Sequence, residues 1–304
     1  MAQNPTHPNR KSSRPKPGAK RGTTLSKSHT IAVAASPKDA TAKPEGDRIA
    51  KVLSRAGVAS RRDAEKLIAD GKVQVNGTVL TSPALNVTSR DKIVVDGKPL
   101  KAPDPARMWL YHKPTGLVTT TRDEQGRATI FDKLPDDLPR VMTIGRLDLN
   151  SEGLLLLTND GGIKRKLELP STGWLRRYRA RVKGAPKDED FAALRAGGKV
   201  DGEVFQPMQI TLDRQQGANA WITVSLREGK NREIRRAMES VGLTVNRLIR
   251  VSYGPFQLGQ LKQGAVEEVR PRMMREQLGM TAEEAGRAEP TPKKPGRQVT
   301  RRRR

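Results

Sequence analysis

Residues 145–161 read GRLDLNSEGLLLLTNDG and hold the most informative pattern in the chain. Asp148 follows Arg146 by two positions and precedes four consecutive leucines, which are typical of a buried strand. A carboxylate beside a guanidinium stays ionised, because positive charge favours its charged form, and an ionised carboxylate can act as a nucleophile. An isolated Arg-x-Asp is more often an ordinary surface pair. The segment therefore predicts a loop that leads into a buried strand. Asp148 is either a nucleophile or one partner of a surface ion pair with Arg146.

The composition indicates a polyanionic partner. The chain has 304 residues with a formal net charge of +25, from 58 Lys and Arg against 33 Asp and Glu. The basic excess is not confined to the two ends, so we expect the folded part to bind the partner as well. No run of eighteen apolar residues occurs and neither end resembles a signal peptide. We expect a nucleic-acid partner, no membrane association and a cytoplasmic location.

The sequence offers few ligands for a metal or cofactor. It contains no cysteine and three histidines, of which His112 alone lies in the expected folded interior. A zinc site of Cys and His is thereby excluded, and a Ser-His-Asp triad would have to use His112. Neither common glycine-rich phosphate loop is present. We expect chemistry that needs no metal and no cofactor.

Composition and periodicity divide the chain into four parts. Residues 1–47 and 276–304 are expected to be disordered basic tails, because they are polar and show no sustained periodicity. Residues 48–105 are expected to form a small unit with a linker, and residues 106–275 a larger domain.

The small unit should hold two short helices and a small twisted sheet. Apolar residues recur at helical spacing from Ile49, and Ser60 is expected to cap a second helix with Asp63 as its capping-box partner. An alternating segment around Asn76-Gly77 predicts a hairpin. Six basic side chains of this unit are candidate RNA ligands: Lys51, Arg55, Arg61, Arg62, Lys66 and Lys72.

Residues 60–77, SRRDAEKLIADGKVQVNG, resemble the alpha-L RNA-binding motif found in a small-subunit ribosomal protein. Arg61 and Arg62 fall at a helix N-terminus, which attracts phosphate. A solvated basic helix face would explain any three of these charges. The full run of matched positions favours RNA binding.

The larger domain is expected to be α+β, with a mixed, largely antiparallel sheet and helices packed on it. Five short segments are predicted strands: 108–112, 117–121, 154–157, 178–182 and 221–226.

Four segments of this domain resemble, in order, the motifs of bacterial pseudouridine synthases of the RsuA/RluB family. They are residues 112–116 (HKPTG), 145–161, 177–182 (RYRARV) and 226–236 (LREGKNREIRR). The last segment, with RLIRVSYG at 247–254, looks most like the branch that modifies large-subunit ribosomal RNA. The resemblance implies that HKPTG supports the floor of the active site and the catalytic loop.

The resemblance also implies residue roles. Asp148 is then the catalytic aspartate, Tyr178 stacks on the target uracil, and Arg235 pairs with the aspartate and keeps it ionised. From the residues alone, Asn231 can cap a helix whose N-terminus attracts anions. We expect the substrate to be bound by Arg146, Lys230, Asn231, Arg232 and Leu248.

The expected activity is isomerisation of one uridine to pseudouridine in large-subunit ribosomal RNA or an assembly intermediate, by a monomer. The uridine must leave the helical stack to be reached, and the basic surfaces would offset that cost. A small-subunit ribosomal RNA synthase and a non-catalytic ribosome-assembly factor are the alternatives. A glycoside or nucleoside hydrolase would normally need a second carboxylate, for which Glu152 is the nearest candidate.

Overall fold

The computed structural model describes residues 45–281, 284 and 285. The two expected tails therefore lie almost entirely outside the described residues. None of the described helices is long and apolar enough to cross a membrane.

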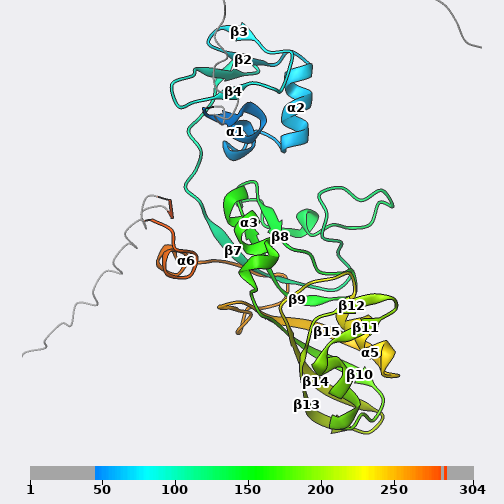
Figure 1. Cartoon of the computed structure of the whole chain (residues 1–304). Helices are drawn as coiled ribbons and strands as arrows, with labels where there is room; N and C mark the ends of the chain where they lie inside the picture. Colours follow the sequence, from blue (N-terminus) through cyan, green and yellow to red (C-terminus); the bar gives the residue numbers. More distant parts are fainter. Residues whose placement is uncertain (1–44, 282–283, 286–304) are drawn as a thin grey trace, which may run out of the picture. The chain divides into compact units, whose positions relative to one another are not determined.

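The small N-terminal unit packs two helices against short strands. In Figure 1 it is the part coloured blue to cyan. Its helices are α1 (Ile49–Arg55) and α2 (Arg61–Ala69). A four-stranded sheet has the order β3-β2-β5-β6, and β1 pairs separately with β4. The strands are β1 (Asp47–Arg48), β2 (Val73–Val75), β3 (Thr78–Val79), β4 (Asn86–Val87), β5 (Ile93–Val95) and β6 (Lys98–Pro99).

Local signals in the sequence account for these elements. The Ser60 hydroxyl accepts a hydrogen bond from the Asp63 backbone N–H at 3.1 Å, so Ser60 caps α2 as predicted. Asn76 and Gly77 both have positive φ between β2 and β3, which is the geometry of the predicted hairpin turn. The apolar faces of both helices then close over the inward side of the sheet in one cluster.

The larger domain is built on one mixed sheet. Its nine strands include a path of order β13-β14-β10-β15-β9-β7-β17, with β16 paired to β15 and β8 paired to β9 (Figure 1). The strands are β7 (Met108–Lys113), β8 (Met142–Ile144), β9 (Glu152–Thr158), β10 (Arg176–Lys183), β13 (Gln209–Gln216), β14 (Asn219–Leu226), β15 (Thr244–Tyr253), β16 (Phe256–Gln257) and β17 (Val266–Glu268). A separate hairpin joins β11 (Gly198–Val200) and β12 (Glu203–Phe205).

Four helices and three single turns of 3-10 helix accompany the sheet. The helices are α3 (Gly161–Glu168), α4 (Ala192–Ala196), α5 (Glu233–Ser240) and α6 (Pro271–Leu278). The 3-10 turns are η1 (Phe131–Lys133), η2 (Pro170–Thr172) and η3 (Asp188–Phe191).

The sheet has two halves that meet at a short parallel pairing. β9 and β15 pair through Glu152 with Ile249 and through Gly153 with Arg250, whereas the other paired strands of this sheet are antiparallel. Gly153 has a φ of +104°, and a Cβ built there would lie 2.4 Å from the Arg250 carbonyl oxygen. Only glycine fits at this approach.

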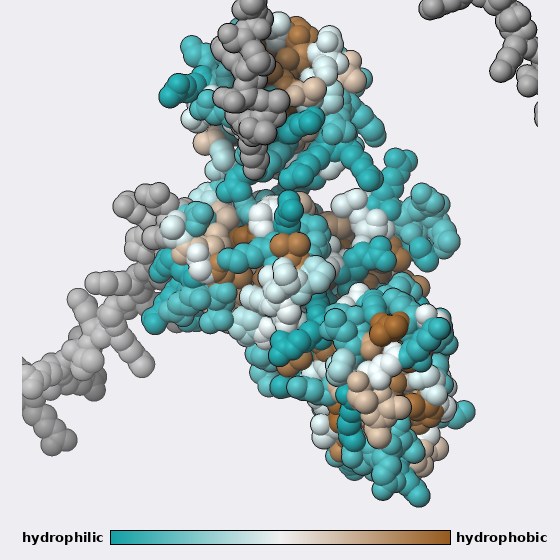
Figure 2. All heavy atoms as spheres, in the orientation of Figure 1, coloured by the Kyte–Doolittle hydropathy of each residue, from teal (hydrophilic) through white to brown (hydrophobic). Residues whose placement is uncertain are grey.

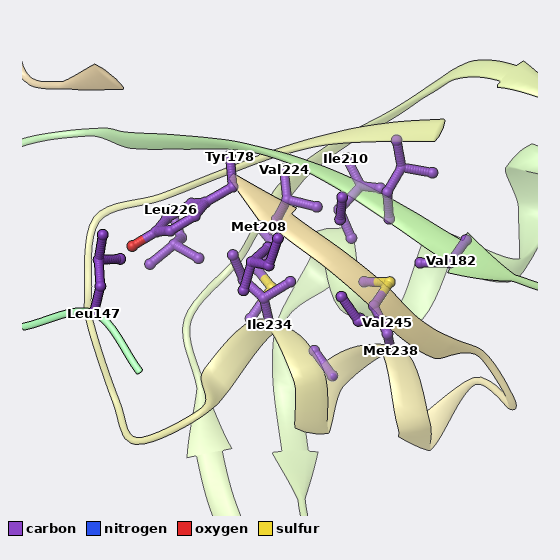
Figure 3. Close-up of a cluster of buried hydrophobic side chains, with 14 of the residues drawn as sticks. Leu147, Tyr178, Val182, Met208, Ile210, Val224, Leu226, Ile234, Met238 and Val245 are labelled. Atoms are coloured by element: carbon purple, nitrogen blue, oxygen red, sulfur yellow. The ribbon is translucent and has the colours of Figure 1, made fainter. Parts of the chain in front are cut away.

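The main apolar core lies between this sheet and α5. Figure 3 shows Ile234 and Met238 of α5 pointing at the strands, with Val182 and Val245 among the side chains between. A second cluster, which includes Leu154 and Leu156 of β9, covers the opposite face at the β7–β9 end. The predicted mixed, largely antiparallel sheet is confirmed.

Two predicted features are wrong. Residues 117–121 form no strand, because their β-pairing is a single isolated bridge between Val118 and Thr129, outside the strands of the sheet. Helix α6 also continues past the boundary expected at residue 275, because Met274 and Leu278 share its buried face.

Candidate active site

The loop between β8 and β9 carries Asp148 and is held by its backbone. Lys113, the last residue of β7, is fully buried and donates from Nζ to the carbonyl oxygens of Pro114, Asp148 and Ser151 at 2.9, 3.2 and 2.9 Å. Burial lowers the pKa of the Lys113 ammonium to about 8, although Asp148 and Glu152 oppose the shift. One buried cation therefore fixes both sides of the loop.

Other groups hold the same loop from different elements. The Thr119 hydroxyl donates to the Leu147 carbonyl oxygen at 2.8 Å. The Gly116 backbone N–H donates to the Leu149 carbonyl oxygen at 2.8 Å. Arg235 of α5 donates from one terminal nitrogen to the Asn150 carbonyl oxygen at 2.9 Å. The expectation that the HKPTG segment supports the catalytic loop has a physical basis in these bonds.

A cavity of about 480 Å³ opens beside the loop. Asp148 lines it together with Arg146 and Arg232, and the segment 118–127 forms its opposite wall. Asp148 is half-buried, whereas both arginines are exposed. The cavity lining therefore combines the Asp148 carboxylate with the guanidinium groups of Arg146 and Arg232, while Asp123 on the 118–127 segment is already paired with Arg127.

The carboxylate of Asp148 has no polar partner among the described residues. No described residue forms a recorded hydrogen bond or ion pair with it. Arg235 was expected to pair with this carboxylate. Instead, the two terminal nitrogens of Arg235 donate to the Val245 and Asn150 carbonyl oxygens, and its Nε is buried without a hydrogen-bond partner. Burial, and then the charge of Arg232, lower the pKa of Arg235, while the charge of Asp148 opposes this. Arg235 thus acts on Asp148 through charge and through the loop backbone.

Tyr178 and Leu248 lie in the apolar core rather than on the wall of this cavity. Tyr178 is 9% exposed and Leu248 is 6% exposed, and both belong to the cluster that contains Leu147. Figure 3 shows the Tyr178 hydroxyl directed at Leu147, the residue before Asp148. Leu147 therefore links the tyrosine to the cavity wall.

The start of α5 differs from the prediction. Arg232 stands at the N-cap with a left-handed φ of +49°, no side chain caps the helix, and Asn231 is exposed one residue further out. The prediction that Asn231 caps this helix is wrong. Glu233 provides the local acceptor instead, since its carboxylate binds the Lys230 backbone N–H at 2.8 Å.

Two further cations of this segment point into an acidic cluster. The Lys230 ammonium lies 3.0 Å from Glu228 and is not part of the cavity wall. The Arg236 guanidinium binds Glu203 at 2.7 Å. The structure therefore brings Arg146 and Arg232 to Asp148, but neither Lys230 nor Arg236.

Glu152 does not serve as a second carboxylate in the cavity. It is 4% exposed and is bound by Arg247, and it also accepts a hydrogen bond from Gln263 at 3.2 Å. The arrangement of two opposed carboxylates that a hydrolase would need is therefore not formed by this pair.

The six basic side chains predicted in the small unit are all exposed. Lys51 pairs with Asp47 at 2.6 Å, and Lys66 lies 3.7 Å from Asp63. Arg61 and Arg62 open α2, as predicted. Figure 2 shows that hydrophilic residues cover most of the face in view, and hydrophobic residues occur there in small groups.

Lys113 is the residue supporting the Asp148 loop that the sequence did not single out. A usable signal exists, because Trp109, Tyr111 and Lys113 occupy alternate positions of one strand and so share its inward face. A lysine that continues an apolar alternation must find polar partners inside the protein. Two of its three partners are carbonyl groups of a loop more than thirty residues away, which the sequence does not reveal.

Comparison with known proteins identifies the family. Residues 107–240 match the family model described as RNA pseudouridylate synthase, and residues 47–93 match the S4 domain. An uncharacterized RNA pseudouridine synthase of Rickettsia prowazekii is 46% identical over 236 residues, which cover 77% of this chain and 98% of that protein. Ribosomal large subunit pseudouridine synthase B of Bacillus subtilis is 38% identical, over 74% of this chain and 93% of that protein.

The fold agrees with this assignment. A crystal structure of a pseudouridylate synthase aligns with a TM-score of 0.55 at 22% identity, covering 76% of this chain and 99% of that one. The resemblance predicted from the sequence motifs is confirmed. The chain belongs to the RNA pseudouridine synthase family and carries an S4 RNA-binding domain ahead of its synthase domain.

Proposed function

We propose that the protein converts one uridine of large-subunit (23S) ribosomal RNA to pseudouridine, with Asp148 as the group that reacts at or stabilises the ribose. The observation that carries this proposal is the loop described above, in which the backbone of Asp148 is bound while its carboxylate faces the cavity unpartnered. Because the carboxylate makes no hydrogen bond to the protein, it does not have to break one before it reacts with the substrate.

The reaction needs no group beyond the chain and the RNA. The bond between uracil N1 and ribose C1′ breaks, the uracil rotates, and C5 joins C1′ while N1 takes up the proton that C5 loses. Asp148 would stabilise the ribose centre in between, and Arg146 and Arg232 would hold phosphates beside it. Tyr178 would stack on the detached uracil once Leu147 moves aside, and Leu248 would line the same space.

Arg235 would position Asp148 in this scheme. The Nε atom of Arg235 is buried without a hydrogen-bond partner. It belongs to the same guanidinium group that holds the loop at the Asn150 carbonyl oxygen. The charge of Asp148 already acts on this guanidinium, and a hydrogen bond from Nε to its carboxylate would satisfy the unpaired donor, which otherwise costs about 1–3 kcal/mol. Lys230 and Asn231 would contact RNA only outside the cavity.

The ribosomal RNA assignment is supported by the relatives named for the large ribosomal subunit, including the 38% identical protein above. We propose a cytoplasmic monomer that acts on this RNA, free or in an assembly intermediate. The S4 domain supports RNA binding ahead of the reaction, through its six exposed cations.

The first test is to map pseudouridines in ribosomal RNA from a strain that lacks the protein. The loss of one pseudouridine from large-subunit RNA is expected, and its restoration by the wild-type protein but not by Asp148→Asn would assign the reaction. Loss from small-subunit RNA would support the alternative substrate. A complete, unchanged set of pseudouridines would overturn the proposal.

The Asp148→Asn protein should retain RNA affinity within a few-fold while its turnover falls by several orders of magnitude, as expected for an essential group. Asp137→Asn is a matched control, because Asp137 is exposed and is not part of the cavity wall. Purified Asn variant with more than about a percent of wild-type turnover would exclude the assigned role. RNA mass should stay constant, whereas hydrolysis would release uracil.

A further inference from the structure

The central strand β10 is basic on one face and apolar on the other. Tyr178, Ala180 and Val182 are buried in the core between the sheet and α5. The alternating positions are exposed and belong to Arg177, Arg179, Arg181 and Lys183. Because successive side chains of a strand point to opposite faces, these four cations lie on the face away from α5 and Tyr178.

Neighbouring strands extend this basic face. Arg181 stands opposite Arg247 of β15 on one side and opposite Trp221 of β14 on the other. Arg214 of β13 stands opposite Trp221 in turn. The Arg179 guanidinium lies over the Trp221 ring, 4.9 Å from its centroid. The result is a surface of six cations around one half-buried tryptophan.

Acidic groups balance only part of this charge. Asp213 lies 3.6 Å from Arg179, and Glu152 pairs with Arg247. The remaining four cations form no ion pair with any residue in the described part of the chain. They are Arg177, Arg181, Lys183 and Arg214. Arg181 also stands directly opposite Arg247, and like charges in such a cross-strand pair are destabilising. A partner that supplies negative charge would therefore stabilise this face.

We propose that this face, defined by Arg177, Arg179, Arg181, Lys183, Arg214 and Arg247, is a second RNA-binding surface that holds the phosphate backbone of a large RNA. The proposal rests on RNA being the substrate. Alternate residues of a strand are spaced by about 7 Å, so the four cations of β10 span roughly 20 Å, which is enough to contact several phosphates. The occupant is RNA rather than an acidic peptide, because the S4 domain and the synthase family already commit the chain to RNA.

The position of the surface makes its effect depend on substrate size. It lies on the opposite face of the sheet from Tyr178, so we expect that a short hairpin bound at the Asp148 cavity does not contact it. A long ribosomal RNA can contact both faces. The surface therefore favours the folded ribosomal substrate over fragments that contain the same uridine.

The test compares Arg177→Gln/Arg181→Gln with wild type on two RNAs. One is purified large-subunit ribosomal RNA from a strain lacking the protein, and the other is a hairpin around the mapped uridine. On the long RNA, affinity should fall and the slope of log affinity against log salt should lose about 1 to 2 units, from two lost phosphate contacts. On the hairpin, kcat/KM should be unchanged.

Two further variants separate charge from structure. Arg177→Lys/Arg181→Lys keeps both charges and should retain the long-RNA affinity. Arg272→Gln/Arg275→Gln removes the same charge from α6 and should leave both RNAs unaffected. An unchanged salt slope on long RNA for the Arg177→Gln/Arg181→Gln protein overturns the proposal, and so does an equal loss on both RNAs.

The two proposals can fail separately. If the wild-type protein makes no pseudouridine but the double variant still binds long RNA more weakly, the proposed function falls and the surface stands. If the wild-type protein makes pseudouridine and the double variant binds long RNA normally, the surface falls and the proposed function stands.

Discussion

At the scale of single residues, the two adjacent arginines of α5 have different environments. Arg235 is 8% exposed and donates to two carbonyl oxygens, a part-buried one in the Asp148 loop and a buried one in β15. Arg236 lies in the surface cluster with Asp201 and Glu203. Neighbouring helix positions point about 100° apart, so only one of the two can face the loop.

Arg235→Ala should therefore slow the reaction far more than Arg236→Ala. Removing the guanidinium leaves two carbonyl acceptors unpaired, one buried and one part-buried. We expect a loss on the order of 3 kcal/mol, which corresponds to about 100-fold in single-turnover rate. Arg235→Lys should rescue little, because an ammonium cannot reproduce the planar fork. Equal losses for both alanine variants in single-turnover measurements would disprove this division of roles.

The sequence predicted single residues well where their role is local or carried by a motif. The Ser60 cap needs only its own helix, and Asp148 with Arg146 falls in one contiguous segment. It failed where partners are distant. Asn231 is a good capping residue, yet the left-handed Arg232 takes the N-cap, and Arg232 also lines the cavity. The burial of Lys113 likewise depends on a loop elsewhere in the chain.

At the scale of elements, the catalytic loop ends where β9 meets β15. The close approach at Gly153 keeps the two strands in register directly after Asp148. The strand elements that the sequence predicted correctly have a strong alternating or apolar pattern, such as β10 and β9. The parallel pairing of β9 with β15 is non-local and has no such pattern to predict it.

Gly153→Ala should destabilise the protein by roughly 3 kcal/mol or more, because a Cβ at positive φ would also collide with the Arg250 backbone. Gly217→Ala is the control. Gly217 also has positive φ, at 56°, but a Cβ there would meet no atom within 4 Å, so only the conformational cost of about 1–2 kcal/mol applies. Chemical denaturation of both variants measures the difference. Equal destabilisation would show that contact with β15 is unimportant.

The first turn of α5 makes stability depend on pH. Burial, with Glu228 nearby, raises the pKa of Glu233 from 4.5 to about 8. Between these values the folded protein keeps a proton that the unfolded chain has released, so the free energy of unfolding falls as pH rises from about 4.5 to about 8. The lowered pKa of Glu228 acts below 4.5 and does not overlap this interval.

Glu233→Gln should remove this dependence and raise stability at pH 8 relative to wild type, since the amide is neutral throughout and its oxygen can still accept from Lys230. The measurement is the free energy of unfolding at pH 5 and at pH 8. Glu239→Gln, at the exposed end of the same helix, should keep the wild-type slope. If the Glu233→Gln protein also kept the wild-type slope, Glu233 would not titrate in this interval.

At the scale of the whole molecule, the S4 domain and the Asp148 cavity occupy different parts of the chain. All residues that line the Asp148 cavity fall between 118 and 232, beyond the S4 domain at 47–93. The two domains were recognisable in the sequence because each has its own contiguous motifs.

A protein that lacks residues 1–100 should bind RNA more weakly and with a smaller salt slope, because several phosphate contacts are lost. Its activity at saturating RNA should persist. Circular dichroism establishes that the fragment is folded before single-turnover rates are compared with those of the full chain. A folded fragment that stays inactive at saturating RNA would show that the S4 domain helps to build the active site.

The pairing of β9 with β15 has a consequence for the order of events during synthesis. Glu152 and Ile249 meet only after the chain between them has left the ribosome, and contacts of such sequence separation form late in folding. Arg235 spans the same junction from Asn150 to Val245. The S4 domain, at residues 47–93, is synthesised before Asp148 and its supporting residues. We therefore expect a nascent molecule to bind RNA before it is able to modify it.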